Sequence, residues 1–318
     1  MSPSLDAIDT DSSLIATMTL QRQQSDSLVA QIRTIYAALA QRSDLHPCKA
    51  VNEIFSELVG LCIQALSEKT ANEVLQNAHI SQLTPSLRKI CSTAEYHLES
   101  YWADLIAQPE AERGVQQNLR NFPYYDNYVD LTRMELGAIY AVRQAAPKKI
   151  AFLGSGPLPL TSLCLCQALG HTRPTSATDL NSTSAGPIVL NIDNNPQAIS
   201  QSRLLCLKLG TMATGMQFLC ADASSSAMGL RDFDVVYLAA LVGQTAKEKE
   251  RVLLNVTSRM SPGSLLVIRT AHSLRKLLYP EFDTSSETVR ACLEICLVVH
   301  PYNHIVNSVI IGRVKEKN

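Results

Sequence analysis

The chain has 318 residues, a length that allows one large domain or two smaller ones. Hydrophobic residues make up 46 % of it and charged residues 18 %, which suits a globular protein and excludes a disordered or fibrous one. The net charge is −1, with 28 basic and 29 acidic residues spread along the chain, so the sequence does not indicate a nucleic-acid partner.

Residues 1–24 are rich in Ser, Asp, Thr and Gln, and we expect them to form a mobile leader or a frayed first helix. They carry acids where a signal peptide would carry positive charge. No run of about 18 apolar residues follows, so a membrane span is not expected either. We therefore expect a soluble, cytoplasmic protein with no membrane partner. The sequence leaves homo-oligomerisation open.

Residues 25–145 have the pattern of a helical bundle. Apolar side chains such as Leu28, Ile32 and Ile35 recur at helical spacing, and glycine is almost absent. This stretch is therefore predicted to form an N-terminal α-helical domain.

Residues 146–318 change to short, apolar, β-branched runs that alternate with helical stretches. Five such runs separated by helices predict a parallel, doubly wound α/β sheet, and the last two predict a terminal hairpin. The polar stretch 171–186 is predicted to be an inserted loop. The expected strands are 150–153, 188–192, 216–219, 235–239, 264–268, 295–299 and 306–311.

The nine cysteines include no paired CxxC clusters, and the seven histidines are scattered. We therefore expect reduced thiols and no metal site.

The first predicted strand runs into a glycine turn, Gly154-Ser155-Gly156, followed by a helix. Such a turn lets the backbone approach a ligand and directs free N–H groups at it. The third glycine of the dinucleotide fingerprint is missing, with Pro159 near its place, so a nucleoside ligand is favoured over a pyrophosphate cofactor.

Acidic residues end the next two predicted strands. Asp193 lies where a ribose diol would bind, and Asp222, after Ala221, is placed to accept from an adenine amine. Either acid alone would equally suit a helix cap or a loop, but the ordered series predicts a nucleoside site. The pattern resembles class I S-adenosylmethionine-dependent transferases, with their mostly parallel seven-stranded Rossmann-like sheet. After the fourth strand, Tyr237, Leu238 and Ala239 are expected to line the same crevice.

Longer stretches resemble the nicotianamine synthase family. They are 94–99, 121–128, 152–162, 234–243, 269–272 and 278–280, within a resemblance that spans about residues 85–312. The resemblance implies a helical domain that caps the S-adenosylmethionine-binding domain and encloses the active site between them.

The family's reaction joins aminocarboxypropyl groups from three S-adenosylmethionine molecules and closes one azetidine ring. It releases methylthioadenosine and makes the metal chelator nicotianamine, and the resemblance implies no metal requirement. Three alternatives stay open. They are a single transfer to another amine, an ordinary S-adenosylmethionine-dependent methyltransferase and a binder that has lost turnover.

The attacking amine must lose a proton, so the reaction needs a base. From the family motifs, Glu99, Tyr124 and Tyr125 are the candidate catalytic residues, and Glu95 is held in reserve. On an arbitrary helix such a glutamate would be solvated surface, and such tyrosines would be packing residues.

Arg269 and His272 follow the fifth strand and are candidates to bind substrate carboxylates, for which the arginine fork is well suited. Structural roles are equally open, with His272 as a helix cap and Arg269 paired to an acid.

Overall fold

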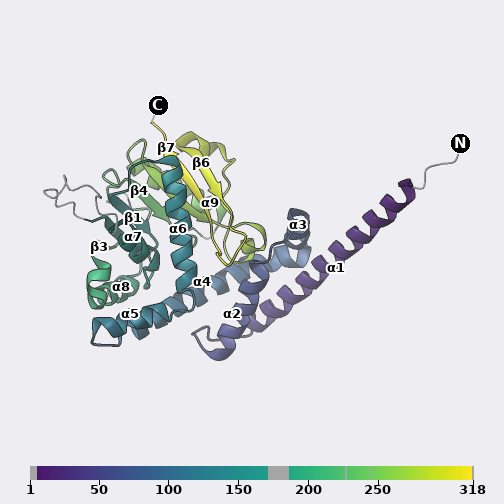
Figure 1. Ribbon diagram of the computed structural model, residues 1–318, viewed down its shortest axis with the longest axis horizontal. Helices are drawn as coiled ribbons and strands as arrows, with labels where there is room; N and C mark the ends of the chain where they lie inside the picture. Colours follow the sequence, from purple (N-terminus) through teal and green to yellow (C-terminus); the bar gives the residue numbers. More distant parts are fainter. Residues whose placement is uncertain (1–5, 171–185, 226–227, 244, 317–318) are drawn as a thin grey trace.

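The computed structural model describes residues 6–170, 186–225, 228–243 and 245–316 (Figure 1). Helices alone form the first part of the chain, and strands alternate with helices from residue 149 onward. The α-helices among the described residues are α1 (Asp6–Ala40), α2 (Lys49–Cys62), α3 (Glu68–Gln76), α4 (Ala78–Ala107), α5 (Glu112–Arg120), α6 (Tyr125–Val142), α7 (Leu160–Gly170), α8 (Pro196–Leu209), α9 (Ala246–Arg259) and α10 (Glu287–Cys292), and the 3-10 helices there are η2 (Gly210–Ala213) and η3 (Ser273–Leu277).

One sheet holds the seven described strands in the order β3-β2-β1-β4-β5-β7-β6. β1 to β5 pair in parallel, whereas β7 lies antiparallel between β5 and β6. The predicted doubly wound, mostly parallel sheet with a terminal antiparallel pair is therefore confirmed. The strands are β1 (Lys149–Leu153), β2 (Ile188–Asp193), β3 (Met216–Cys220), β4 (Val235–Leu238), β5 (Leu265–Thr270), β6 (Leu293–Val299) and β7 (Ser308–Val314).

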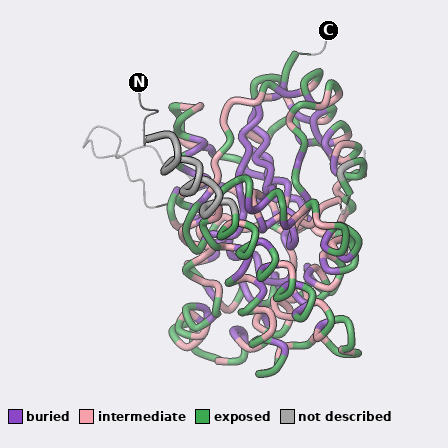
Figure 2. Tube along the Cα trace, turned by 90° about the vertical axis from the view of Figure 1, so that its right-hand side faces the viewer, coloured by how far each residue is buried: buried purple, intermediate pink, exposed green. Residues whose placement is uncertain are grey.

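Helices cover both faces of the sheet. Side chains of α6 and α7 pack on one face, and side chains of α9 and α10 pack on the other. Because both faces are covered, β4 and β5 are buried along their whole length and β1 is buried from Ile150 onward. Figure 2 shows the buried residues in purple through the interior of the molecule. Because β1 pairs in parallel with both β2 and β4, the carboxyl ends of these three strands meet at one edge of the sheet. The loops that follow the strands supply the exposed polar groups at this edge.

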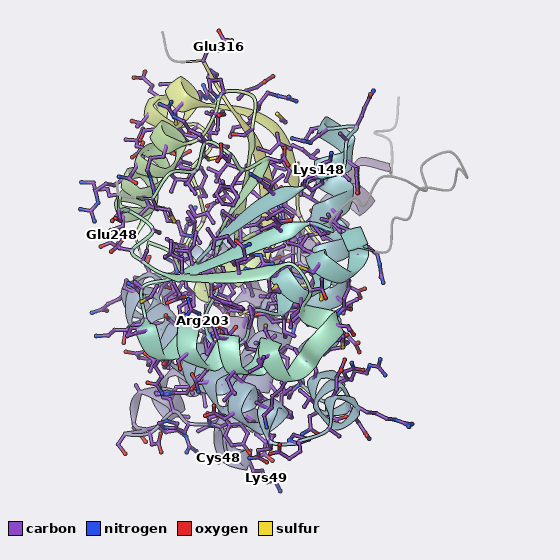
Figure 3. All side chains as sticks on the ribbon, turned by 90° about the vertical axis from the view of Figure 1, so that its left-hand side faces the viewer. Cys48, Lys49, Lys148, Arg203, Glu248 and Glu316 are labelled. Carbon is purple, nitrogen blue, oxygen red and sulfur yellow. The ribbon has the colours of Figure 1, made fainter. Side chains whose placement is uncertain are left out.

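The helices α1 to α4 share a separate core, which also takes in Leu274 and Leu277 from η3. Figure 1 shows α4 and α5 passing beneath the sheet part while the amino-terminal end of α1 projects away. In Figure 3, Cys48 and Lys49 mark the helical end of the molecule and Glu316 the opposite end. The helical part therefore closes one side of the sheet.

The helix α4 joins the two parts of the chain. Its later residues pack with α5, α7 and α8 in a further apolar cluster, and the Ser100 hydroxyl and the Gln201 amide of α8 are hydrogen-bonded at 2.9 Å. Residues on α4 are thereby held in a fixed position relative to the strand ends.

Two predictions fall partly outside the described ranges. Residues 6–24 of the expected leader form the first part of α1, and residues 1–5 are not described. Nearly all of the expected loop 171–186 is also outside them. Within those ranges, none of the helices combines the length and the apolar character that crossing a bilayer requires.

Candidate active site

The turn after β1 has the conformation that its glycines permit. Gly154 and Gly156 have φ values of 79° and 66°, which residues with a Cβ rarely adopt. The N–H groups of Gly154 and Ser155 donate to the Ile192 carbonyl at 2.8 and 3.1 Å, so the turn is tied to the end of β2. A Cβ at Gly154 would lie 2.5 Å from the Val242 side chain, which explains why the turn needs glycine there.

Asp193, at the end of β2, binds this turn directly. Its Oδ2 accepts from the Gly156 N–H at 2.9 Å, and its Oδ1 accepts from the Asn195 N–H at 2.9 Å. The carboxylate therefore fixes the glycine turn as well as facing the crevice. Asp222, beyond β3, accepts from the Ser224 N–H and hydroxyl, and these hydrogen bonds lower the pKa of Asp222.

A cavity of about 620 Å³, the sheet-edge cavity, opens at these strand ends. Its lining contains Glu99 from α4 and Arg269 from β5 as well as the predicted nucleoside-binding residues Gly154, Ser155, Gly156, Asp193, Ala221, Asp222 and Ala239. Tyr237 and Leu238 are not part of this lining. Both are fully buried in β4, and the Tyr237 ring stacks on Phe152 with centroids 5.3 Å apart.

A second cavity of about 320 Å³, the bundle cavity, lies among α2, α4 and the start of α6. It shares one wall with the sheet-edge cavity, and this shared wall consists of Glu95, Glu99, Tyr128 and Asn307. Glu95 and Glu99 are four residues apart on α4, so they lie on the same helical face. Side chains at this wall are therefore open to both cavities.

Glu99 connects the helical part to the glycine turn. Its Oε1 accepts from the Tyr128 hydroxyl at 3.0 Å, and its Oε2 lies 2.6 Å from the point that a Cβ of Gly156 would occupy. Burial and the nearby Glu95 raise the pKa of Glu99 well above its usual range, against the smaller lowering effect of the Tyr128 hydrogen bond. A carboxylate with a raised pKa is a better proton acceptor, as a general base requires.

Glu95 has a similar arrangement. Its Oε2 accepts from the Tyr279 hydroxyl at 2.8 Å, and burial raises its pKa. Burial also raises the pKa of Tyr128 and of Tyr279 well above the ordinary phenol value. Both phenols therefore stay protonated and act as hydrogen-bond donors to the two carboxylates.

The two predicted tyrosines lie in different places. Tyr124 lines the bundle cavity, whereas Tyr125, the first residue of α6, lies outside the lining of both cavities. The tyrosine that donates to Glu99 is Tyr128, one helical turn further along α6.

Arg269 lines the sheet-edge cavity, but its guanidinium is already paired. It makes a bidentate contact with Glu135 of α6 at 2.7 and 3.1 Å and donates to the Thr161 hydroxyl at 2.6 Å. Burial opposes the charged form, but the Glu135 carboxylate outweighs it and raises the pKa of Arg269. Arg269 therefore links α6 to β5, and most of its hydrogen-bonding capacity is used within the protein.

His272 is not brought to either cavity. It precedes η3 without capping that helix through its side chain, and its ring stacks on His300 with centroids 4.1 Å apart.

The sequence did not single out Tyr128, Tyr279 or Asn307. Tyr128 belongs to the family-like stretch 121–128, but nothing within that stretch shows that this tyrosine, rather than Tyr124 or Tyr125, donates to Glu99. Asn307 precedes the last strand and carries no motif. Among the residues whose placement is described, no group of three or more His, Cys, Asp or Glu side chains is arranged to hold a metal ion.

Known proteins resemble this chain along nearly its full length. The family model described as "Nicotianamine synthase protein" matches residues 21–318. Nicotianamine synthase 9 of Hordeum vulgare is 35 % identical over 291 residues, which are 91 % of this chain and 79 % of the relative. Nicotianamine synthase of Solanum lycopersicum is 34 % identical over 289 residues, covering 91 % and 84 %.

Solved structures share the fold. A variant of MtNAS in complex with S-adenosylmethionine superposes with a TM-score of 0.72 at 20 % identity, over 91 % of this chain and 98 % of that one. MtNAS in complex with MTA and tNA gives 0.70 at 20 % identity, over 90 % and 98 %. With the family match over all but the first 20 residues and relatives above 30 % identity, this chain belongs to the nicotianamine synthase family.

Proposed function

We propose that this protein makes nicotianamine from three molecules of S-adenosylmethionine and releases methylthioadenosine at each transfer. Family membership supports this activity. The observation that assigns the activity to particular residues is the position of Glu99. Its carboxylate lies beside the glycine turn at Gly156 and lines both cavities. The nucleoside and the proton acceptor are thus held next to each other.

In each transfer, an amine nitrogen attacks the γ-carbon of the methionine part of S-adenosylmethionine. The new N–C bond forms as the C–S bond breaks, and the electron pair of that bond stays on sulfur in methylthioadenosine. Glu99 takes the proton that the amine gives up, and the Tyr128 hydroxyl orients the carboxylate. The same sulfonium could lose its methyl group instead, so the product depends on which carbon the protein holds in line with the amine.

The adenosine part fits the sheet-edge cavity. The turn 154–156, Asp193, Ala221, Asp222 and Ala239 offer backbone N–H groups, carboxylates and small side chains at the ends of adjacent strands. The larger of the two cavities is therefore assigned to S-adenosylmethionine, and the bundle cavity on the far side of Glu99 has room for an amine acceptor.

We also propose the cytoplasm as the location. All nine cysteines are free thiols, as expected in a reducing compartment.

The test is to incubate the purified full chain with S-adenosylmethionine alone and to identify the products by mass spectrometry. Methylthioadenosine together with nicotianamine is expected. Methylthioadenosine that forms only after another amine is added would make this a single-transfer enzyme, and S-adenosylhomocysteine would make it a methyltransferase. If none of these products forms, the protein is a binder without turnover.

A further inference from the structure

Asn307 is the residue of the shared wall whose buried side-chain amide nitrogen lacks a hydrogen-bond partner in the described part of the chain. It lies just before β7, its side chain is only 8 % exposed, and it lines both cavities. Its Nδ2 is covered and has no hydrogen-bond acceptor among the residues that the structure describes. A buried amide without a partner costs roughly 1–3 kcal/mol, so its presence at a cavity wall points to a ligand that supplies the missing acceptor.

The segment that carries Asn307 is held in place on both sides. The Val306 N–H donates to the Asn127 side chain of α6 at 3.2 Å, and the Ser308 hydroxyl lies 2.9 Å from Nδ1 of His300. The backbone of Asn307 therefore stays fixed at the wall. Only its terminal amide is free to turn, because the last torsion of asparagine has a broad energy minimum.

No other group in the shared wall has an N–H to offer. Glu95 and Glu99 are carboxylic acids, and the Tyr128 hydroxyl already donates to Glu99. Arg269 lines the sheet-edge cavity but is not part of the shared wall, and its Nε and Nη2 groups donate to Glu135 and Thr161. Among the four residues of the shared wall, Asn307 is thus the one whose side chain carries N–H groups for a substrate carboxylate.

A neutral donor also suits the neighbouring base. A cation at this position would favour the ionised form of Glu99 and lower its pKa, which would weaken it as a proton acceptor. An amide binds a carboxylate without adding charge, so the raised pKa of Glu99 is preserved.

We infer that Asn307 is a substrate-binding residue that donates from its side-chain amide to an α-carboxylate of the acceptor held between the two cavities. Methylthioadenosine has no carboxylate, so it does not need this contact. Nicotianamine has three carboxylates and does. This inference rests on the proposed function.

Binding of these two compounds to the full-length protein separates the contact from a general loss of structure. We expect Asn307→Leu, which keeps the side-chain size but removes the donor, to weaken nicotianamine binding by about tenfold or more in calorimetry. Asn307→Asp replaces the donor with a negative charge that repels the ligand carboxylate, and we expect it to weaken nicotianamine binding further. The affinity for methylthioadenosine should change less than about twofold in both variants, because neither substitution removes a hydrogen bond to this compound.

Asn255→Leu is the matched control, because Asn255 of α9 also has a buried side-chain atom without a partner but lies outside both cavities. It should leave both affinities unchanged.

Equal loss of both ligands in Asn307→Leu would overturn the inference, since it would indicate a structural role. Nicotianamine binding that is the same in wild type and Asn307→Leu, in a protein that turns over S-adenosylmethionine, would overturn the inference alone. A wild-type protein that neither turns over S-adenosylmethionine nor binds nicotianamine would overturn the proposed function as well.

Discussion

The two sides of the sheet-edge cavity hold their carboxylates in different ways. On the sheet side, Asp193 and Asp222 accept hydrogen bonds from backbone N–H groups at the ends of strands. On the helical side, Glu95 and Glu99 accept from phenol hydroxyls that come from distant parts of the chain. The donors on the sheet side are backbone N–H groups of the turns that follow the strands, and the donors on the helical side are side chains brought there by tertiary packing.

This difference has a chemical consequence. Hydrogen bonds from Ser224 lower the pKa of Asp222, so this acid stays ionised and serves as a fixed acceptor. Burial raises the pKa of Glu95 and of Glu99, so these carboxylates bind a proton more tightly than an exposed glutamate does. The sheet side is therefore suited to binding, and the helical side to proton transfer.

The sharpest test of this division removes the ability of Glu99, the base that we propose, to accept a proton while keeping the shape of its side chain. Glu99→Gln should lower kcat by roughly 100- to 10,000-fold, because the amide cannot accept the proton of the amine. Affinity for S-adenosylmethionine, measured by calorimetry, should stay within a few-fold because the sheet side is untouched.

Glu53→Gln is the control for this experiment, as Glu53 is an exposed residue of α2. Normal turnover by Glu99→Gln would transfer the role of base to Glu95.

The two sides are joined by the buried pair of Arg269 on β5 and Glu135 on α6. Arg269→Met should lower the free energy of unfolding by about 3–5 kcal/mol, because it leaves the Glu135 carboxylate buried without its partner. Chemical denaturation measures this directly.

Two further variants sharpen the result. Arg133→Met, at a largely exposed ion pair with Asp130, should cost less than about 1 kcal/mol. The double variant Arg269→Met/Glu135→Leu should recover most of the loss. No recovery would mean that lost packing, not the unpaired charge, destabilises Arg269→Met.

A change on the sheet side should act on binding first. Asp193→Ala removes the acceptor for the Gly156 and Asn195 N–H groups, and we expect it to weaken S-adenosylmethionine binding by roughly 10- to 100-fold. Asp283→Ala, which removes a similar turn-forming acid outside both cavities, should have no effect. A lower kcat with unchanged affinity in Asp193→Ala would break the division between the two sides.

The smallest expected effect is on pH dependence. Turnover should fall as the pH drops through the raised pKa of Glu99, by up to about tenfold per pH unit, since the protonated acid is no base. Stability should change in the opposite direction. Between the usual glutamate pKa and the raised one, the folded state binds more protons than the unfolded state, so the contribution of Glu99 to stability is present at low pH and is lost as the pH rises.

The wild-type protein and Glu99→Gln should be compared by rate profiles and by denaturation across this range. An identical pH dependence of stability in the two proteins would contradict the raised pKa.

The sequence was sufficient for the local part of this architecture. The strands from β1 to β5 and the turn 154–156 follow from short apolar runs and glycines that neighbouring residues decide. The insertion of β7 between β5 and β6 was not predicted, because strand order depends on pairing between distant segments. Packing also crosses the expected division near residue 145, since Leu131 and Ile139 of α6 belong to the core beneath the sheet.

The contacts that side chains make on the helical side were harder to predict from sequence. The hydrogen bond from Tyr128 to Glu99 joins α6 to α4 across 29 residues of sequence, and which tyrosine makes it depends on how these two helices lie relative to each other. The partner of Arg269 is 134 residues away in sequence, so no local pattern reveals that its charge is already matched. Such choices depend on long-range contacts that a single sequence does not show.

The contact between Gly156 and Glu99 also bears on how this protein tolerates mutation. Any other residue at position 156 would have to adopt an unfavourable positive φ, and its Cβ would lie 2.6 Å from the Glu99 carboxylate. We therefore expect a saturation scan of this position to recover glycine alone. Gly60 of α2, with nothing within 4 Å of an added Cβ, should accept alanine freely. We therefore expect a change at residue 156 to be tolerated only together with a change at residue 99, although one lies in the turn after β1 and the other on α4.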